Sequence, residues 1–239
     1  MCPWIRRIGR IALCVAGLLA LPHGAVADPL KILFVGDSIT EGGNRTRDES
    51  TYRVPLQALI GATGVAVDYV GTRAEGLHRD ARWPLGFDPH HEAYYGASTA
   101  FVRDQLRAHL GRFDAPDIAL IYLGTNDRDS DEIIEPLEDI VRMLRSRNPN
   151  VVVLVGQLAQ HDWKTLWRRL RVGRMVDRLN TPESPVVAVD HSEDWVADPS
   201  RKESDTYDWI HPNPRGQSHM ALAWFAALRP YLKGMSAPV

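Results

Sequence analysis

Four short segments of this chain carry residue types that can perform nucleophilic catalysis. They are Gly36-Asp37-Ser38-Ile39-Thr40, Gly96, Gly124-Thr125-Asn126-Asp127 and Asp208-Trp209-Ile210-His211-Pro212. A serine hydroxyl is a poor nucleophile until a base accepts its proton. His211 can be that base, and Asp208 lies three residues earlier, so one turn brings its carboxylate back to the ring Nδ1. Together the segments predict a hydrolase with a serine nucleophile, with oxyanion donors in the second and third segments.

Two of these segments directly follow apolar runs that we predict to be buried strands. Lys31–Gly36 leads to Ser38, and the run from Asp117 to Leu123 leads to Asn126. In a parallel α/β sheet the carboxyl ends of the strands form the edge at which ligands bind. We therefore expect Ser38 and Asn126 to lie at the same edge.

Each segment alone also has a purely structural interpretation. Gly-Asp-Ser after a strand is often a turn into a helix with Asp or Ser as the cap, and His211 alone can be a surface histidine beside a proline. We expect Asp127 to cap a helix or bond nearby backbone, and we assign it no chemistry. Two polar clusters at strand ends, followed by a late Asp-x-x-His, favour the catalytic interpretation.

In this order the segments resemble the SGNH superfamily, also called GDSL hydrolases. The four residues that name the superfamily would be Ser38, Gly96, Asn126 and His211, and the resemblance runs from about Leu30 to Leu232. It implies that Ser38 attacks an ester carbonyl, that the N–H groups of Ser38 and Gly96 and the Asn126 side chain form the oxyanion hole, and that Asp208 orients His211. It also implies a flavodoxin-like strand order of 2-1-3-4-5.

Within that superfamily the chain is most similar to carbohydrate esterase family three, the acetylxylan esterases. The similarity rests on Asp37–Gly42, Tyr52-Arg53, Tyr69–Thr72, His91-Glu92, Gly124–Asp127 and Tyr207–Asn213. The family tends to have small residues around the second-block glycine, whereas this chain has Tyr94 and Tyr95 before Gly96. Two aromatic rings there would reshape the acyl or leaving-group side of the pocket. The resemblance therefore supports the implied mechanism more strongly than the implied substrate.

The first 27 residues have the pattern of a secretory signal peptide. Arg6, Arg7 and Arg10 precede an apolar stretch from Ile11 to Leu21, and Ala25-Val26-Ala27 supplies small residues before a cleavage site after Ala27. The apolar stretch is short for a bilayer span. We expect an exported protein, periplasmic or extracellular, with an uncleaved anchor as the alternative.

The amino-acid composition excludes several kinds of functional site and argues against some kinds of binding partner. Both cysteines, Cys2 and Cys14, precede the predicted cleavage site, which excludes disulfides, thiolate catalysis and zinc-cysteine sites in residues 28–239. Removing three arginines from the 28 basic residues leaves 25 against 30 acidic ones, a net charge of −5. This balance gives no reason to expect a nucleic acid or an anionic lipid as partner. About 210 residues predict one domain, residues 28–239, with its own core.

Apolar runs alternate with helical patterns, which predicts a three-layer α/β sandwich with a five-stranded parallel sheet. The predicted strands are Lys31–Gly36, Val65–Val70, Asp117–Gly124, Val151–Leu158 and Val186–Val189. The predicted helices are Arg53–Ile60, Thr99–Leu110, Asp131–Arg147, Trp163–Leu179 and Pro214–Leu232. Pro136 is tolerable only near a helix start, so the third of these helices can begin there instead.

Three further features invite a functional interpretation. The helix Trp163–Leu179 is strongly basic, which we read as a solvated face, with Leu166, Leu170, Val172, Met175, Val176 and Leu179 as its core stripe. Asp88, His90, His91 and Glu92 match no strong metal motif, so we expect no metal and no cofactor, and assign His91-Glu92 to bracing the Gly96 loop. Four aromatic residues have two possible roles: they line the cleft, where their faces would suit a sugar ring, or they pack against the protein beside the active site. They are Trp209, Trp83, Tyr94 and Tyr95.

These observations predict an exported serine esterase that removes a short acyl group, most simply acetyl, from carbohydrate. A lysophospholipase or acyl-thioester hydrolase of the same superfamily is the alternative enzyme. A carbohydrate-binding protein that retains the fold without catalysis is the alternative of another class. The presence of Ser38, Asn126, Asp208 and His211 together argues against that last class.

Overall fold

The structure is a computed structural model that describes residues 28–42, 50–78, 82–129 and 131–232. The predicted signal peptide lies outside the described residues. The elements are β1 (Leu30–Gly36), α1 (Ser38–Glu41), α2 (Arg53–Gly61), β2 (Val67–Val70), β3 (Glu92–Ala93), α3 (Thr99–His109), β4 (Ile118–Tyr122), α4 (Asp131–Arg147), β5 (Val152–Gln157), α5 (Trp163–Leu179), β6 (Val186–Asp190) and α6 (Pro214–Leu232).

The sheet has five parallel strands in the order β2-β1-β4-β5-β6, and the two-residue β3 pairs with the end of β1. The predicted fold class and strand order are confirmed, whereas β3 and the single-turn α1 were not predicted. Strand β2 pairs with one side of β1, and β4 pairs with the other side. The carboxyl ends of β1 and β4 therefore form the topological switch point, where α/β sheets bind ligands.

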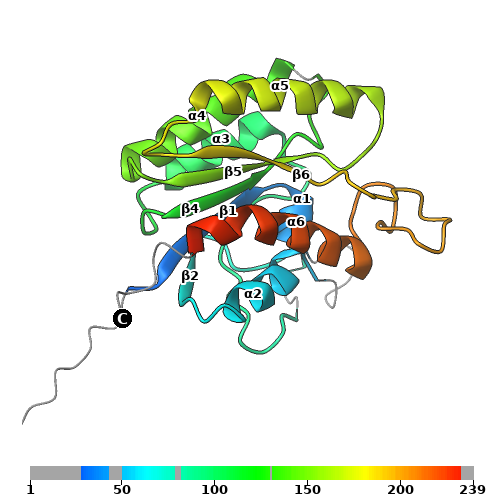
Figure 1. Ribbon diagram of the computed structural model, residues 1–239, viewed down its shortest axis with the longest axis horizontal. Coiled ribbons are helices and arrows are strands. Elements are labelled where there is room, and N and C mark those ends of the chain that lie inside the picture. The colour runs from blue at the N-terminus through cyan, green and yellow to red at the C-terminus, as the bar shows by residue number, and fades with distance from the viewer. Residues whose placement is uncertain (1–27, 43–49, 79–81, 130, 233–239) are drawn as a thin grey trace, which may run out of the picture.

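Helices cover both faces of the sheet, with α2 and α6 on one side and α3, α4 and α5 on the other (Figure 1). Successive side chains of a strand point to opposite faces. Along β1, Ile32 and Phe34 join the core beneath α2 and α6, while Leu33 and Val35 join the core beneath the other three helices. Burial on both faces explains why the strands read as continuous apolar runs rather than as alternating ones.

Helix α4 differs from the expectation that it could begin at Pro136, because it begins at Asp131 and Pro136 lies inside it. Proline lacks the N–H that would bond four residues back, so the interior position costs one helical hydrogen bond. The apolar face of α4 compensates, since Ile133, Leu137 and Ile140 are all buried in the core.

Helix α5 also departs from its predicted core stripe. Val172, Met175 and Val176 are buried as expected, but Leu166 and Leu170 are about half exposed, at 51% and 47%. The buried face of α5 runs through Thr165, Arg168 and Val172. Leu166 and Leu170 therefore point away from the core, and the prediction was wrong for these two residues.

Candidate active site

Ser38 is the first residue of α1 and is buried at the carboxyl end of β1. Asp37 caps α1, because its carboxylate accepts the Ile39 N–H at 3.0 Å. Gly36 permits the sharp turn from strand to helix, since a Cβ at this position would lie 2.1 Å from Thr40 Oγ1. The sequence Gly-Asp-Ser thus positions the hydroxyl at the switch point.

His211 and Asp208 lie on the loop between β6 and α6, which projects from the carboxyl edge of the sheet (Figure 1). The loop closes on itself through Tyr207 N–H, which donates to the His211 carbonyl at 2.9 Å. Trp209 occupies the tip with φ of 72°, a left-handed conformation that a residue with a side chain rarely adopts. Its N–H donates to Thr206 Oγ1 at 3.0 Å, which holds this conformation.

The loop brings His211 between the other two residues. Ser38 Oγ lies 3.0 Å from His211 Nε2, and His211 Nδ1 lies 3.0 Å from Asp208 Oδ2. Asp208 Oδ1 also accepts the His211 N–H at 2.8 Å. Partial burial raises the pKa of Asp208, but the hydrogen bonds from His211 outweigh burial and leave the pKa below its usual range. The carboxylate thus stays ionised and can stabilise an imidazolium.

Gly96 and Asn126 belong to two loops that lie beside each other at the carboxyl edge of the sheet. The Asn126 side chain donates to the carbonyl of Ala97 at 3.0 Å, which ties the loop after β4 to the Gly96 loop. Gly96 has φ of 66°, a conformation that favours glycine. Asp127 accepts hydrogen bonds from the Thr99 N–H and hydroxyl, at 3.1 and 2.8 Å. The expectation that Asp127 bonds nearby backbone is confirmed.

The aromatic side chains divide into two groups. Tyr95 is half exposed, and its ring lies parallel to that of His211, with 6.4 Å between centroids. Trp209 is 57% exposed at the tip of the loop that carries His211. Tyr94 instead donates its hydroxyl to Glu92 at 2.7 Å, and Trp83 packs on Phe87 with its N–H bonded to the Ala74 carbonyl. We retain Tyr95 and Trp209 as candidates to contact substrate, and not Tyr94.

Two buried charges beside α1, Arg53 and Glu41, were not predicted from the sequence. Arg53 is fully buried and donates to the carbonyls of Thr40, Glu41 and Pro89. Glu41, also buried, pairs with Arg73 at 2.6 Å. Arg53 follows Tyr52 in one of the resembling segments, but only the folded chain shows that its guanidinium holds α1 in place.

The four residues of the suspected metal cluster do not converge. Asp88 pairs with His90 at 2.7 Å. His91 accepts the Ala93 N–H at Nδ1 and donates from Nε2 to the Glu75 carbonyl, and burial keeps the pKa of His91 well below its usual range. Glu92 accepts from Thr72 and Tyr94. No group of three or more metal-ligating side chains forms among the described residues, and His91 and Glu92 brace the loop before Gly96.

A family model described as the GDSL-like lipase/acylhydrolase family matches residues 34–219, which include every catalytic candidate. The chain belongs to the GDSL-like lipase/acylhydrolase family. This membership and its esterase neighbours in structure identify the protein as a carboxylic ester hydrolase. A search of curated proteins returned no match.

Several solved structures resemble this GDSL hydrolase. A carbohydrate esterase of family 3 from Talaromyces cellulolyticus is 27% identical, with a TM-score of 0.71, and the match covers 87% of this chain and 100% of that one. An acetyl esterase mutant solved with acetate ion is 26% identical, with a TM-score of 0.70 and the same coverage. A Clostridium thermocellum family 3 carbohydrate esterase, at 21% identity and a TM-score of 0.66 over 88% of this chain and all of that one, shares the fold.

Proposed function

We propose that this GDSL hydrolase is an exported serine esterase that removes acetyl or another short acyl group from carbohydrate. The observation that carries the proposal is the continuous chain of hydrogen bonds from Ser38 Oγ through the His211 ring to Asp208, at 3.0 Å each. The printed descriptions of the neighbours at 27% and 26% identity, a family 3 carbohydrate esterase and an acetyl esterase, support the substrate class.

In the proposed reaction His211 Nε2 accepts the Ser38 proton while Oγ bonds to the ester carbonyl carbon. The carbonyl oxygen becomes an oxyanion, which the Ser38 and Gly96 N–H groups and the second N–H of the Asn126 amide stabilise. Collapse expels the sugar hydroxyl, which takes its proton from His211. Water then attacks the acyl carbon while His211 accepts its proton. Collapse breaks the bond from this carbon to Ser38 Oγ, which takes the proton back from His211, and the carboxylic acid leaves and ionises.

The first test concerns the nucleophile. Ser38→Ala should reduce kcat by about 10³-fold or more while the fold survives, because no other group in the site replaces the oxygen nucleophile. Ser146→Ala is the matched control, since Ser146 lies on the exposed surface of α4. Labelling by a serine-directed organophosphorus reagent at a residue other than Ser38 would contradict the assignment.

The second test concerns the acyl group. A series of esters from acetyl to dodecanoyl should show kcat/KM highest for acetyl, with acetate released from acetylated xylan or oligosaccharides. A long-chain substrate needs an apolar slot, because each buried methylene contributes about 0.8 kcal/mol of binding. Tyr95→Gly should extend acceptance toward longer chains. A wild-type preference for octanoyl or longer esters would replace this proposal with the lipid or thioester alternative and leave the roles of Ser38 and His211 unchanged.

A further inference from the structure

Arg168 belongs to the basic helix α5, but its side chain is not in solvent. The sequence pattern predicts a solvated face for the charges of this helix, whereas Arg168 is only 8% exposed. A buried guanidinium loses its hydration, so it needs hydrogen-bond acceptors within the protein. The acceptors of Arg168 therefore indicate why the charge is buried.

Arg168 donates hydrogen bonds to the loop that carries Asn126. Its Nη2 atom bonds the carbonyl oxygen of Asp127 and that of Arg128, the latter at 3.3 Å. Asp127 and Arg128 are the two residues that follow Asn126 in the loop after β4. Backbone carbonyls beyond the end of a strand lose their partners in the sheet and need other donors when they are buried. Arg168 supplies these donors from a helix that is distant in the sequence.

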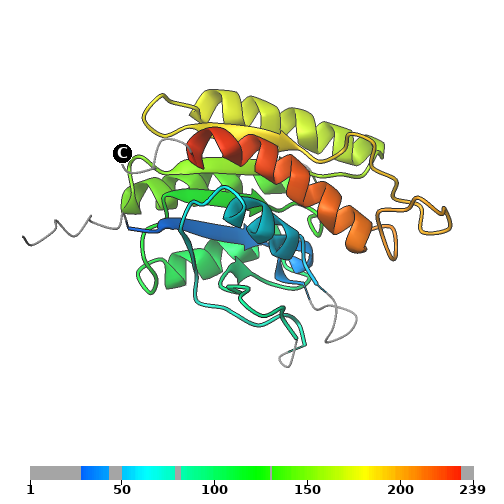
Figure 2. The same ribbon diagram turned by 60° about the horizontal axis from the view of Figure 1, so that its bottom comes forward.

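The position of α5 explains how Arg168 reaches this loop. Helix α5 begins at the same end of the molecule as the loop that carries His211 (Figure 2). Strand β5, which leads into α5, pairs directly with β4. Arg168 lies in the second turn of α5, near the start of the helix. Its guanidinium therefore reaches the carboxyl edge of the sheet, where Ser38 and Asn126 lie.

Two further contacts tie the same loop to the chain at the start of α3. The Asn126 amide donates to the Ala97 carbonyl at 3.0 Å. The Asp127 carboxylate accepts from the Thr99 N–H and hydroxyl, at 3.1 and 2.8 Å. These bonds hold the loop against α3, and the bonds from Arg168 hold it against α5. A rotation of the peptide groups beside Asn126 would break at least one of them.

Arg168 also interacts with Asp127 through its charge. Burial raises the pKa of Asp127, although the hydrogen bonds from Thr99 and the charge of Arg168 act in the opposite direction. A cation near a buried carboxylate favours the ionised form, and an ionised carboxylate accepts stronger hydrogen bonds than a neutral one does. Arg168 thus supports the loop directly through the two carbonyls and indirectly through the Asp127 carboxylate.

We propose that Arg168 is a positioning residue of the oxyanion hole and acts through Asn126. The inference rests on the proposed function, in which the second N–H of the Asn126 amide stabilises the oxyanion. Such a donor contributes most when it already points at the place where charge develops. A misplacement of about 1 Å in a catalytic group can cost about 10²-fold in rate. The bonds that hold the Asn126 loop should therefore affect kcat.

The experiment is a double-mutant cycle that measures hydrolysis of nitrophenyl acetate. Arg168→Met keeps an unbranched side chain and removes the N–H donors. It should reduce kcat by about 10- to 100-fold and leave KM nearly unchanged, because an oxyanion donor acts mainly in the transition state. In a protein that already carries Asn126→Ala, Arg168→Met should change kcat by less than about twofold, since the amide that Arg168 positions is absent.

Arg145→Met is the matched control. Arg145 on α4 also donates from Nη2 to two backbone carbonyls, those of Leu179 and Ser184, both at 2.7 Å. The segment from Leu179 to Ser184 leads into β6, so it lies at the amino end of the sheet and away from Ser38. Both methionine variants should unfold at a lower temperature than the wild type, because each leaves two carbonyls without their donor. Arg145→Met should nevertheless leave kcat unchanged.

Two results would overturn the role of Arg168 alone. Either Arg168→Met reduces kcat equally with and without Asn126→Ala, or it reduces kcat no more than Arg145→Met does. If Arg168→Met does not fold, Arg168→Gln takes its place in the same cycle, because its amide is polar but too short to reach both carbonyls. Full activity of Asn126→Ala by itself would instead refute the oxyanion role in the proposed function, so the two proposals fail in different measurements.

Discussion

Asp37 is buried, and its carboxylate caps the helix that begins with Ser38. Burial raises the pKa of Asp37 to about 6, although the Ile39 N–H and the Thr125 hydroxyl act in the opposite direction. The Asp37 carboxyl thus holds its proton more tightly in the folded protein than in the unfolded chain. The contribution of this group to the free energy of unfolding is complete below the pKa of the unfolded chain. It is lost as the pH rises through the pKa of the folded protein.

Asp37→Asn should remove this dependence, because the amide oxygen can still cap Ile39 and carries no charge. Between about pH 4 and about pH 7, the free energy of unfolding of the wild type should fall relative to that of Asp37→Asn by up to about 3 kcal/mol. Urea unfolding at a series of pH values measures the difference. Parallel stability curves for the two proteins would mean that the carboxylate ionises in the fold as easily as in water.

Asn126 offers a second prediction at the scale of one residue. One of its two amide N–H groups is bonded to the Ala97 carbonyl, which aims the other. Asn126→Ala should reduce kcat by about 10²–10³-fold with little change in KM, because an oxyanion donor acts mainly in the transition state. Asn150→Ala, at an exposed asparagine near the opposite end of the sheet, is the control. An effect confined to KM would assign Asn126 to substrate binding.

At the scale of elements, α6 and the loop that carries His211 approach closely at Gly216. A Cβ on Gly216 would lie 2.1 Å from the Asp205 carbonyl oxygen, which also accepts the Asn213 N–H. Gly216→Ala should therefore destabilise the protein by about 1–3 kcal/mol and reduce activity, because the loop must shift.

Gly173 of α5 is the matched control for Gly216, because the nearest atom to its Cβ would be Gln157 Nε2 at 3.8 Å. Gly173→Ala should stabilise the helix by up to about 1 kcal/mol through propensity alone. Thermal unfolding and kcat of both variants test the pair. Equal effects of the two substitutions would show that the contact with Asp205 relaxes without cost.

Elements were predictable wherever burial and periodicity agree. The strands of the sheet are apolar on both faces, so their order in the chain indicated the parallel sheet and placed Ser38 and Asn126 at one edge. The β3 strand escaped prediction because Glu92 and Ala93 are too short a run to show a period. The error at Leu166 and Leu170 has a different origin: both residues continue a helical apolar pattern, and hydrophobicity alone does not say which face of α5 meets the sheet.

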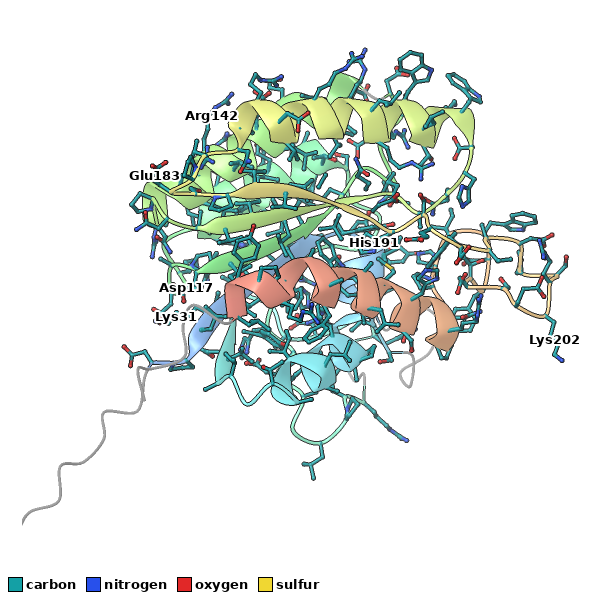
Figure 3. All side chains as sticks on the ribbon, in the orientation of Figure 1. Lys31, Asp117, Arg142, Glu183, His191 and Lys202 are labelled. Carbon is teal, nitrogen blue, oxygen red and sulfur yellow. The ribbon has the colours of Figure 1, made fainter. Side chains whose placement is uncertain are left out.

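At the scale of the whole molecule, the burial of several polar and charged side chains could not be inferred. Arg53, Glu92 and His91 are buried because they bond carbonyls and hydroxyls from loops that are distant in the sequence. His191 is a further example. It follows β6, at the end of the sheet opposite Lys31 and Asp117 (Figure 3), and it packs against Trp224 and Tyr122. Burial lowers the pKa of His191 to about 3, so it stays neutral.

The extent of the folding unit gives a prediction for the whole chain. The described core residues run from Leu30 to Leu232 and fill both faces of the sheet. A protein that begins at Asp28 should therefore unfold cooperatively at the same temperature as the full chain, within about 2 °C. Calorimetry of the two proteins measures both unfolding temperatures. A lower transition temperature for the shorter protein would show that the first 27 residues contribute to the fold.

The hydrogen bond between Ser38 Oγ and His211 Nε2 joins residues 173 positions apart. Contacts of such separation form late, because the loop between them must first be closed. In the proposed mechanism, a chain still attached to the ribosome with residue 211 inside the exit tunnel lacks its base, so we expect it not to hydrolyse esters. The rate at which ester hydrolysis recovers after dilution from denaturant should therefore report when the His211 loop packs against Ser38. We expect this recovery to be slower than the recovery of the helical circular dichroism signal.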